Sequence, residues 1–152
     1  IYWNLLGGND HGIRLFPSNE CLICNNEINQ SSHYDIRLEN SSNNNLISGN
    51  LIDGGGVSGS SGGIFLDLSH KNIISNNSII DCGIVDCIRL TDSDKNIVSN
   101  NVCETNTGWG IHITNSGSNN NLVIGNMLLS NTYGQFNNLG TDTEFGLNVE
   151  IT

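Results

Sequence analysis

Basic residues are scarce in this 152-residue chain, and their scarcity excludes several classes of protein. Five Lys and Arg stand against fifteen Asp and Glu, which gives a formal net charge of −10. Binding to nucleic acid needs clustered cations, so we expect no nucleic-acid partner, and an anionic membrane surface is disfavoured for the same reason. No apolar run is long enough to predict a membrane span.

The cysteines and histidines do not form a recognisable metal or disulfide framework. Five cysteines are an odd number, so at least one stays unpaired. Cys21 and Cys24 form a CxxC pair, but no second pair follows at zinc spacing. The four histidines occupy different positions in the repeat described below: His11, His33, His70 and His112. We therefore expect no metal site and no cofactor, and we expect the cysteines to be small buried residues.

Asparagine is abundant, with 27 residues, and its placement is periodic. One asparagine recurs at spacings of 24, 27, 24 and 25 residues: Asn26, Asn50, Asn77, Asn101 and Asn126. An apolar residue stands three positions before each of them: Ile23, Ile47, Ile74, Val98 and Val123. Another stands two positions after: Ile28, Ile52, Ile79, Cys103 and Leu128. A fixed period of this length indicates a repeat architecture in which similar units stack on one another.

Three further columns follow the same period. Pairs of apolar residues two positions apart alternate as a half-buried strand does: Ile13 and Leu15, Ile36 and Leu38, Ile64 and Leu66, Ile88 and Leu90, Ile111 and Ile113. Three residues past each pair stands a serine: Ser18, Ser41, Ser69, Ser93 and Ser116. A second asparagine column comprises Asn45, Asn72, Asn96 and Asn121, with Cys21 in its first place.

Each repeat thus holds three short strands, none of which buries a face alone, so successive coils must stack. We predict an all-β protein, a single-stranded right-handed parallel β-helix of about five to six coils of 24–27 residues. Residues 1–152 would form one domain, either complete or a segment of a longer solenoid. The asparagine columns are predicted to be hydrogen-bonded ladders at the turns. Two insertions are expected between coils, from Gly54 to Gly62 and from Gly117 to Asn120.

The repeats resemble those of a known family. The resemblance rests on three runs: Asn45-Leu46-Ile47-Ser48-Gly49-Asn50-Leu51-Ile52, Gly63-Ile64-Phe65-Leu66, and Asn72-Ile73-Ile74-Ser75-Asn76-Asn77. They are similar to the parallel β-helix repeats of the pectate-lyase-like superfamily, in its Asn-rich surface-protein type. The resemblance covers roughly residues 10–132 and implies the fold. It implies no single function, because this fold carries lyases, hydrolases, epimerases, tailspikes, adhesins and structural repeats.

One predicted outward column carries all three arginines of the chain: Arg14, Arg37, Phe65, Arg89 and His112. The columns that flank it add His11, Tyr34, Asp86 and Trp109 on one side, and Phe16, Glu39 and Asp67 on the other. Arginine can fork onto a uronate carboxylate, and an aromatic ring can stack on a sugar. We interpret this face as a candidate carbohydrate-binding surface. The alternative is an ordinary polar surface with cross-strand ion pairs.

A second outward column is aliphatic: Leu22, Leu46, Ile73, Ile97 and Leu122. If it lies on the surface, it forms a stripe suited to contact with another molecule. The alternative is that the turn draws the column into the core. Both ends of the sequence read as strands without caps, so other copies of the chain, or adjoining solenoid coils, are the expected partners.

Two functions are compatible with these patterns. The leading hypothesis is an extracellular or cell-surface structural or adhesive β-solenoid that self-associates, end to end or laterally, and so forms filaments. The alternative is a carbohydrate-active or carbohydrate-binding β-helix that acts on an acidic polysaccharide as a lyase, hydrolase or epimerase. No catalytic motif is recognisable, so no catalytic residue is assigned and the sequence leans towards a protein that is not an enzyme.

Overall fold

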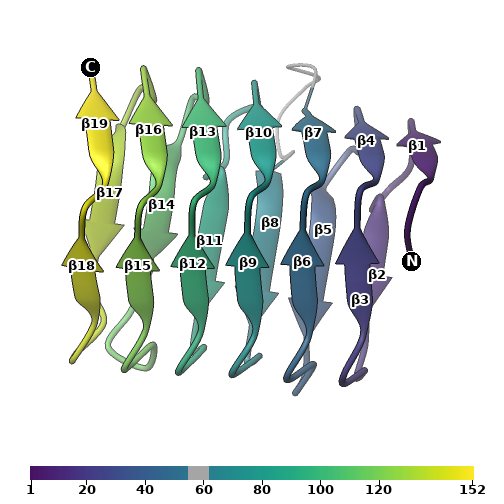
Figure 1. Ribbon diagram of the computed structural model, residues 1–152. Helices are drawn as coiled ribbons and strands as arrows, with labels where there is room; N and C mark the ends of the chain where they lie inside the picture. Colours follow the sequence, from purple (N-terminus) through teal and green to yellow (C-terminus); the bar gives the residue numbers. More distant parts are fainter. Residues whose placement is uncertain (55–61) are drawn as a thin grey trace.

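The computed structural model describes residues 1–54 and 62–152, which form strands and turns wound into a solenoid (Figure 1). Each coil gives one strand to each of three parallel sheets, and the coils stack from the N terminus to the C terminus. The described residues form one seven-stranded and two six-stranded sheets, about six turns, and contain no helix. The predicted all-β, right-handed parallel β-helix is therefore confirmed.

The strands are short, and every pairing between coils is parallel. Sheet 1 contains β1 (Leu5–Gly7), β4 (Glu27–Asn29), β7 (Leu51–Asp53), β10 (Ser78–Ile80), β13 (Val102–Glu104), β16 (Met127–Leu129) and β19 (Val149–Ile151). Sheet 2 contains β2 (Ile13–Leu15), β5 (Tyr34–Glu39), β8 (Gly62–Asp67), β11 (Ile88–Thr91), β14 (Trp109–Ile113) and β17 (Gly134–Asn138). Sheet 3 contains β3 (Leu22–Cys24), β6 (Leu46–Ser48), β9 (Ile73–Ser75), β12 (Ile97–Ser99), β15 (Leu122–Ile124) and β18 (Glu144–Gly146).

The core consists of the apolar columns predicted from the period. In sheet 2, Ile36 pairs with Ile64, and Ile64 pairs with Ile88. In sheet 3, Ile47 pairs with Ile74 in the same way. Each of these side chains is fully buried, and burial of one such side chain stabilises the fold by about 1.5–3 kcal/mol.

Both predicted asparagine ladders are present, and a central rung shows how they work. The Oδ1 atom of Asn77 accepts hydrogen bonds from the backbone N and the Nδ2 of Asn50, at 3.0 and 2.9 Å. Its Nδ2 donates to the carbonyl oxygen of Ile47 at 3.0 Å and to Oδ1 of Asn101 at 2.9 Å. The side chain thus satisfies backbone groups that turn away from the sheets, which is why the position demands an amide.

The residue before each asparagine of this ladder adopts a left-handed backbone conformation. Asn25, Asn76 and Asn100 have φ angles of 55°, 56° and 55°. Glycine takes the same place at Gly49 and Gly125, with φ angles of 68° and 70°. Asn and Gly are the residues that tolerate this region best, so the recurring Asn-Asn and Gly-Asn dipeptides each encode a turn residue followed by a ladder rung.

The serines that bond between coils coincide only in part with the serine column noted in the sequence. The hydroxyls that accept backbone hydrogen bonds between coils belong to Ser42, Ser93 and Ser118, whose donors are Ser18, Ser69 and Ser93, each at 3.1 Å. Ser42 and Ser118 therefore form these bonds in the coils where the constant offset gives Ser41 and Ser116. The turn after sheet 2 varies in length by one or two residues, so a constant offset from the strand does not identify its rung.

The corner between sheets 1 and 2 carries a shorter ladder that the sequence did not predict. The backbone N of Cys82 donates to Oδ1 of Asn106 at 2.9 Å, and Nδ2 of Asn106 donates to Oδ1 of Asn131 at 2.7 Å. Beside it, Cys87 and Cys103 form a disulfide, with their Cα atoms 6.1 Å apart.

The predictions about the cysteines and about the first insertion have different outcomes. The expectation of buried cysteines holds for Cys82, Cys87 and Cys103, whereas Cys21 and Cys24 are half-buried. The insertion predicted between Gly54 and Gly62 lies, apart from these two end residues, outside the described residues.

Candidate functional site

The outer face of sheet 2 gathers the arginines into one column. The strand register aligns Arg14 with Arg37, then Phe65, Arg89 and His112. Because the strands are parallel and in register, side chains more than 20 residues apart in sequence become neighbours about 4.8 Å apart. We call this surface, with the columns that flank it, the sheet 2 face.

Phe65 lies between two arginines at the centre of this face. The guanidinium carbons of Arg37 and Arg89 lie 5.5 and 5.4 Å from the centre of its ring. Tyr34 packs against the same ring, with 4.7 Å between ring centres. Cations attract the negative face of an aromatic ring at this distance, so Phe65 holds both guanidinium groups in place.

The carboxylate of Glu39 is committed to two of the arginines. One of its oxygens pairs with Nε of Arg14, and the other lies 2.7 Å from a terminal nitrogen of Arg37. Asp67, the equivalent residue one coil later, lies 4.0 Å from Arg37. Partial burial raises the pKa of Asp67, with the charge of Glu39 adding to the effect and that of Arg37 opposing it. Glu39 thus acts as an anchor for arginines, with neither oxygen left to take part in acid–base chemistry.

Arg89 differs from its two equivalents. Among residues 1–54 and 62–152 no carboxylate forms an ion pair with its guanidinium. It lies against Phe65 and close to Tyr34, where burial raises the pKa of the phenol although the charges of Arg89 and Arg37 act to lower it. Arg89 is therefore a cation held by aromatic rings and available to an incoming anion.

The ring of Tyr34 packs against a glycine. It lies over Gly62 of the next coil, where an added Cβ would approach the ring to 2.8 Å. Trp109 lies over Gly134 in the same way, with a corresponding approach of 2.4 Å. Both aromatic side chains thus lie flat along the sheet 2 face because the neighbouring coil carries no side chain beneath them.

His112 and Asp86 form a hydrogen-bonded pair next to Arg89 in the register. Nδ1 of His112 lies 2.8 Å from Oδ2 of Asp86, whose other oxygen accepts the backbone N–H of Trp109 at 2.9 Å. A carboxylate only accepts hydrogen bonds, so this contact places the imidazole hydrogen on Nδ1. Nε2 then carries a lone pair, which faces Nδ2 of Asn137 at 3.3 Å. A histidine oriented in this way can accept a proton.

Other predicted residues lie towards one end of the face and do not join this centre. Phe16 is exposed and lies beneath the guanidinium of Arg14, 5.5 Å from ring centre to guanidinium carbon. The ring of His11 stacks on that of Tyr34 at 6.3 Å, and burial lowers its pKa. His33, which the sequence left unassigned, pairs with Asp10 at 2.6 Å beside it.

Asn137 was missed because the repeat was not extended beyond His112. The register places it in the column of the arginines, opposite His112. Its position 25 residues after His112 matches the period, so extending the column by one coil would have found it.

The aliphatic column lies on the outer surface of sheet 3. Leu22 and Ile73 are 57% and 40% exposed, and Leu46, Ile97 and Leu122 are half-buried. The turn therefore does not draw this column into the core.

Two other features are absent from the part of the chain that the structure describes. Residues 1–54 and 62–152 hold no group of three or more His, Cys, Asp and Glu side chains placed to bind a metal ion. The same residues include no helix that is long and apolar enough to span a membrane.

The sequence matches the family described as the right handed beta helix region over residues 1–150. The chain belongs to this family. No curated protein matches the sequence. The family assignment agrees with the coil winding described above.

Solved structures of similar shape confirm the fold and extend beyond this chain. A mutant of the periplasmic alginate epimerase AlgG has a TM-score of 0.84 at 19% identity, over 100% of this chain and 39% of that one. The enzymatically active domain of bacteriophage CBA120 tailspike protein 2 has a TM-score of 0.64 at 16% identity, over 95% of this chain and 23% of that one. The Azotobacter vinelandii mannuronan C-5 epimerase AlgE4 A-module has a TM-score of 0.53 at 10% identity, over 100% and 55%. The chain thus spans about two fifths of the length of the first of these proteins.

Proposed function

We propose that the sheet 2 face binds an acidic polysaccharide, with Arg89 pairing with a uronate carboxylate. The observation that carries this proposal is the Arg89 guanidinium, which lies on Phe65 without an ion-pair partner among the described residues. Arginine pairs with a carboxylate through two parallel hydrogen bonds, so a bound uronate would supply the missing partner. Similarity in shape to alginate and mannuronan epimerases supports a polymer of this class.

The Asp86–His112 pair indicates what could follow binding. A carboxylate neutralised by Arg89 makes the neighbouring C–H bond of the sugar more acidic, because the arginine stabilises the negative charge that develops on proton removal. Nε2 of His112 carries the lone pair needed to accept that proton, and Nδ2 of Asn137 lies 3.3 Å from it. The electron pair left behind can expel the neighbouring glycosidic oxygen, which gives a lyase reaction, or take a proton back on the opposite face of the ring, which gives epimerisation. We favour these reactions over hydrolysis because Glu39 is committed to Arg14 and Arg37.

The test combines a binding and a turnover measurement on a panel of polyuronates that includes alginate. Arg89→Ala should weaken binding in calorimetry by about 10- to 100-fold, the cost of losing a charge-assisted hydrogen-bonded pair. Arg14→Ala is the matched control, because Arg14 stands in the same column but is already paired with Glu39. His112→Ala should keep binding and lose exchange of the sugar C–H proton with deuterated water. A parent protein that binds no polyuronate would show that the proposal is wrong.

A second candidate is a structural or adhesive solenoid that self-associates through sheet 3. The exposure of Leu22 and Ile73 on its outer surface supports lateral contact between two copies of the chain. Light scattering across a wide concentration range tests it. Leu22→Asp with Ile73→Asp should shift any oligomer towards monomer, and a parent that stays monomeric at every concentration would rule out this candidate.

We also propose an extracellular or cell-surface location for either function. The disulfide between Cys87 and Cys103 supports it, since disulfides persist in oxidising compartments. Thiol counting on protein isolated under acid quench tests this directly, because a reduced pair in the native source would contradict the location.

A further inference from the structure

Both lysines of the chain lie side by side at the corner between sheets 2 and 3. Lys71 and Lys95 are the only lysines in the sequence, and each stands two residues before a pair of aligned strand residues, Ile73 and Ile97. They therefore occupy equivalent places on adjacent coils, about 4.8 Å apart along the axis. Both have left-handed backbone angles, with φ of 58° and 59°.

A pocket of about 240 Å³ opens between the two lysines. Its lining consists of Asn43, Asn44, His70, Lys71, Asp94 and Lys95. Neither lysine forms an ion pair with any residue of 1–54 or 62–152, although the chain carries fifteen acidic side chains. The two positive charges repel each other at this spacing, and no ion pair with a described carboxylate offsets that repulsion.

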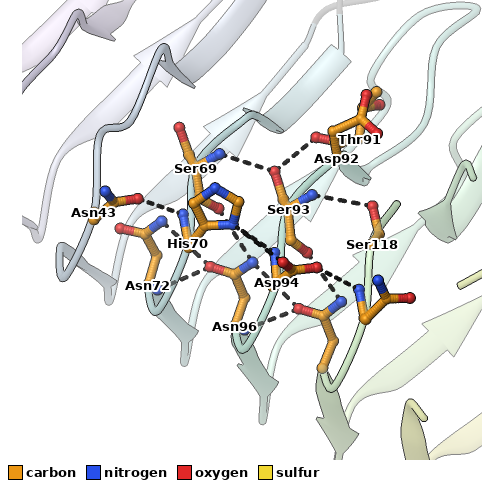
Figure 2. Close-up of polar contacts among 12 residues, drawn as sticks. Asn43, Ser69, His70, Asn72, Thr91, Asp92, Ser93, Asp94, Asn96 and Ser118 are labelled. Atoms are coloured by element: carbon orange, nitrogen blue, oxygen red, sulfur yellow. Dashed lines mark hydrogen bonds and ion pairs between the residues drawn. The ribbon is translucent and has the colours of Figure 1, made fainter. Parts of the chain in front are cut away.

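Three of the residues that line the pocket, Asn43, His70 and Asp94, belong to a third kind of polar ladder, whose contacts Figure 2 shows. Oδ1 of Asn43 accepts the backbone N–H of His70 at 2.6 Å, and Nδ1 of His70 accepts the backbone N–H of Asp94 at 3.0 Å. Oδ1 of Asp94 then accepts the backbone N–H of Asn119 at 2.7 Å. Each rung is an acceptor, so His70 takes part as the tautomer whose hydrogen is on Nε2.

The ladder leaves one donor of His70 unused. No described residue accepts a hydrogen bond from Nε2 of His70, so this N–H is available to a ligand. Asp94 is the one carboxylate on the pocket wall, and its Oδ1 is occupied by Asn119 while Oδ2 lies 3.7 Å from Nδ1 of His70. The pocket is thus lined by two lysines without ion-pair partners among the described side chains and by a histidine whose Nε2–H has no acceptor there.

We propose that this corner binds a compact oxyanion, a sulfate or carboxylate group, between Lys71 and Lys95, with Nε2–H of His70 as the third donor. Such a group carries the negative charge and the acceptor oxygens that pair with these donors. The group could be a free anion or a pendant group of an acidic glycan. The site lies off the sheet 2 face and does not depend on the function proposed above.

The composition makes a selective experiment possible. Reductive methylation with ¹³C-formaldehyde keeps the charge of each amine, and within residues 1–152 the only side chains that it labels are those of Lys71 and Lys95, alongside the α-amino terminus of the protein. Sodium sulfate and sodium glucuronate are titrated against sodium chloride at equal ionic strength, and the labelled signals are followed by NMR. We expect both lysine signals to shift along one saturating curve with at least one of the two oxyanions, while the α-amino signal does not move.

Variants and a polymer complete the test. Lys71→Asn and Lys95→Asn suit the backbone, because Asn44 and Asn120 occupy the equivalent places with φ of 58° and 57°. Each should weaken binding about tenfold, the usual effect of losing one charge-assisted contact, and Lys71→Arg should preserve it. Dextran sulfate that binds far more tightly than sulfate identifies the pendant group of a glycan as the source, whereas equal affinity per sulfate identifies a free anion. Shifts that match those in chloride, or Asn variants that bind as the parent does, would falsify the site.

Discussion

The two corners with complete asparagine ladders differ from the corner between sheets 1 and 2. At the complete ladders the rungs are amides that both donate and accept, apart from Cys21 at the start of one ladder, and their partners repeat from coil to coil. At the third corner the ladder positions hold Ser31, Cys82, Asn106 and Asn131, of which only the last two bond side chain to side chain. The comparison shows that one corner can lose its regular pattern while the other two keep the coils in register.

The irregular corner also buries a carboxyl group. Asp35 is fully buried, and its contact with the Ser31 hydroxyl falls short of normal hydrogen-bond geometry. Burial raises the pKa of Asp35 to about 7, although the Ser31 side chain acts to lower it and Asp53 adds repulsion. The last complete coil buries a neutral amide at this corner instead. The side-chain oxygen of Gln135 accepts a hydrogen bond there from Nδ2 of Asn131 at 2.7 Å. An amide stays neutral at any pH, whereas the buried carboxyl of Asp35 is neutral only when it is protonated.

The largest expected effect comes from Asp35→Asn. The folded pKa of about 7 lies above the ordinary value of 3.8, so between these pH values the folded state holds a proton that the unfolded state has lost. The contribution of Asp35 to stability is therefore full below pH 4 and falls by about 4 kcal/mol as the pH rises to 7 and above. Chemical denaturation of parent and variant from pH 4 to pH 8 should show that the stability advantage of the variant grows as the pH rises. Parallel pH profiles would mean that Asp35 is not held in its protonated form.

Asn77→Ala should destabilise the protein by roughly 3 to 4 kcal/mol, because it removes the acceptor of the Asn50 backbone N–H, the donor to the Ile47 carbonyl oxygen and the side-chain hydrogen bond to Asn101. Asn106→Ala at the irregular corner is the matched comparison and should cost less, since its side chain serves fewer neighbours. Urea unfolding measures both free energies. Equal losses would show that the two corners contribute equally to stability, which would contradict the expected difference.

The disulfide between Cys87 and Cys103 should stabilise the irregular corner by about 3 kcal/mol, since it closes a loop between residues 16 apart in sequence. The double variant Cys87→Ala with Cys103→Ala should lose that amount in denaturant melts under oxidising conditions. Addition of reductant to the double variant is the control and should change nothing. A parent whose melt is insensitive to reductant would indicate that the bond contributes little.

The smallest expected effect concerns the turn residue at a complete ladder. Gly125→Ala should cost about 1 kcal/mol, because the φ of 70° disfavours a residue with a Cβ. Gly125→Asn should be nearly neutral, since Asn100 and Asn76 already occupy this place in the two preceding coils. Thermal melts of the two variants compare them, and an alanine variant as stable as the asparagine one would remove the backbone explanation.

The core and the complete ladders could be predicted because their pattern repeats. Ile36, Ile64 and Ile88 are equivalent in sequence and stack in the structure, so one repeat predicts the next. The bonding serines Ser42 and Ser118 could not be found from a constant offset, because turns of unequal length shift the residue that faces the next coil. The rungs Asn106 and Asn131 were not predicted, since earlier coils hold Ser31 and Cys82 in their places.

The candidate sites were predicted less completely than the fold. The column of Arg37, Phe65 and Arg89 followed from the strand period, because it lies on one face of a single sheet. The Asp86–His112 pair did not follow from the strand period, since the two residues come from different columns and meet only because consecutive coils stack. The pocket between Lys71 and Lys95 was also not predicted, because each lysine alone is an ordinary turn residue.

The sequence by itself determined how the chain winds, since each repeat carries the strand alternation and turn residues of one coil. Only the tertiary structure decided which outward side chains meet. Arg14 and Arg37 are committed to Glu39 while Arg89 is left to the aromatic rings, and that difference arises from contacts across coils. The physical reason is that winding depends on local backbone preferences repeated along the chain. Contacts between coils depend on how long each intervening turn is and which side chain it presents to its neighbour.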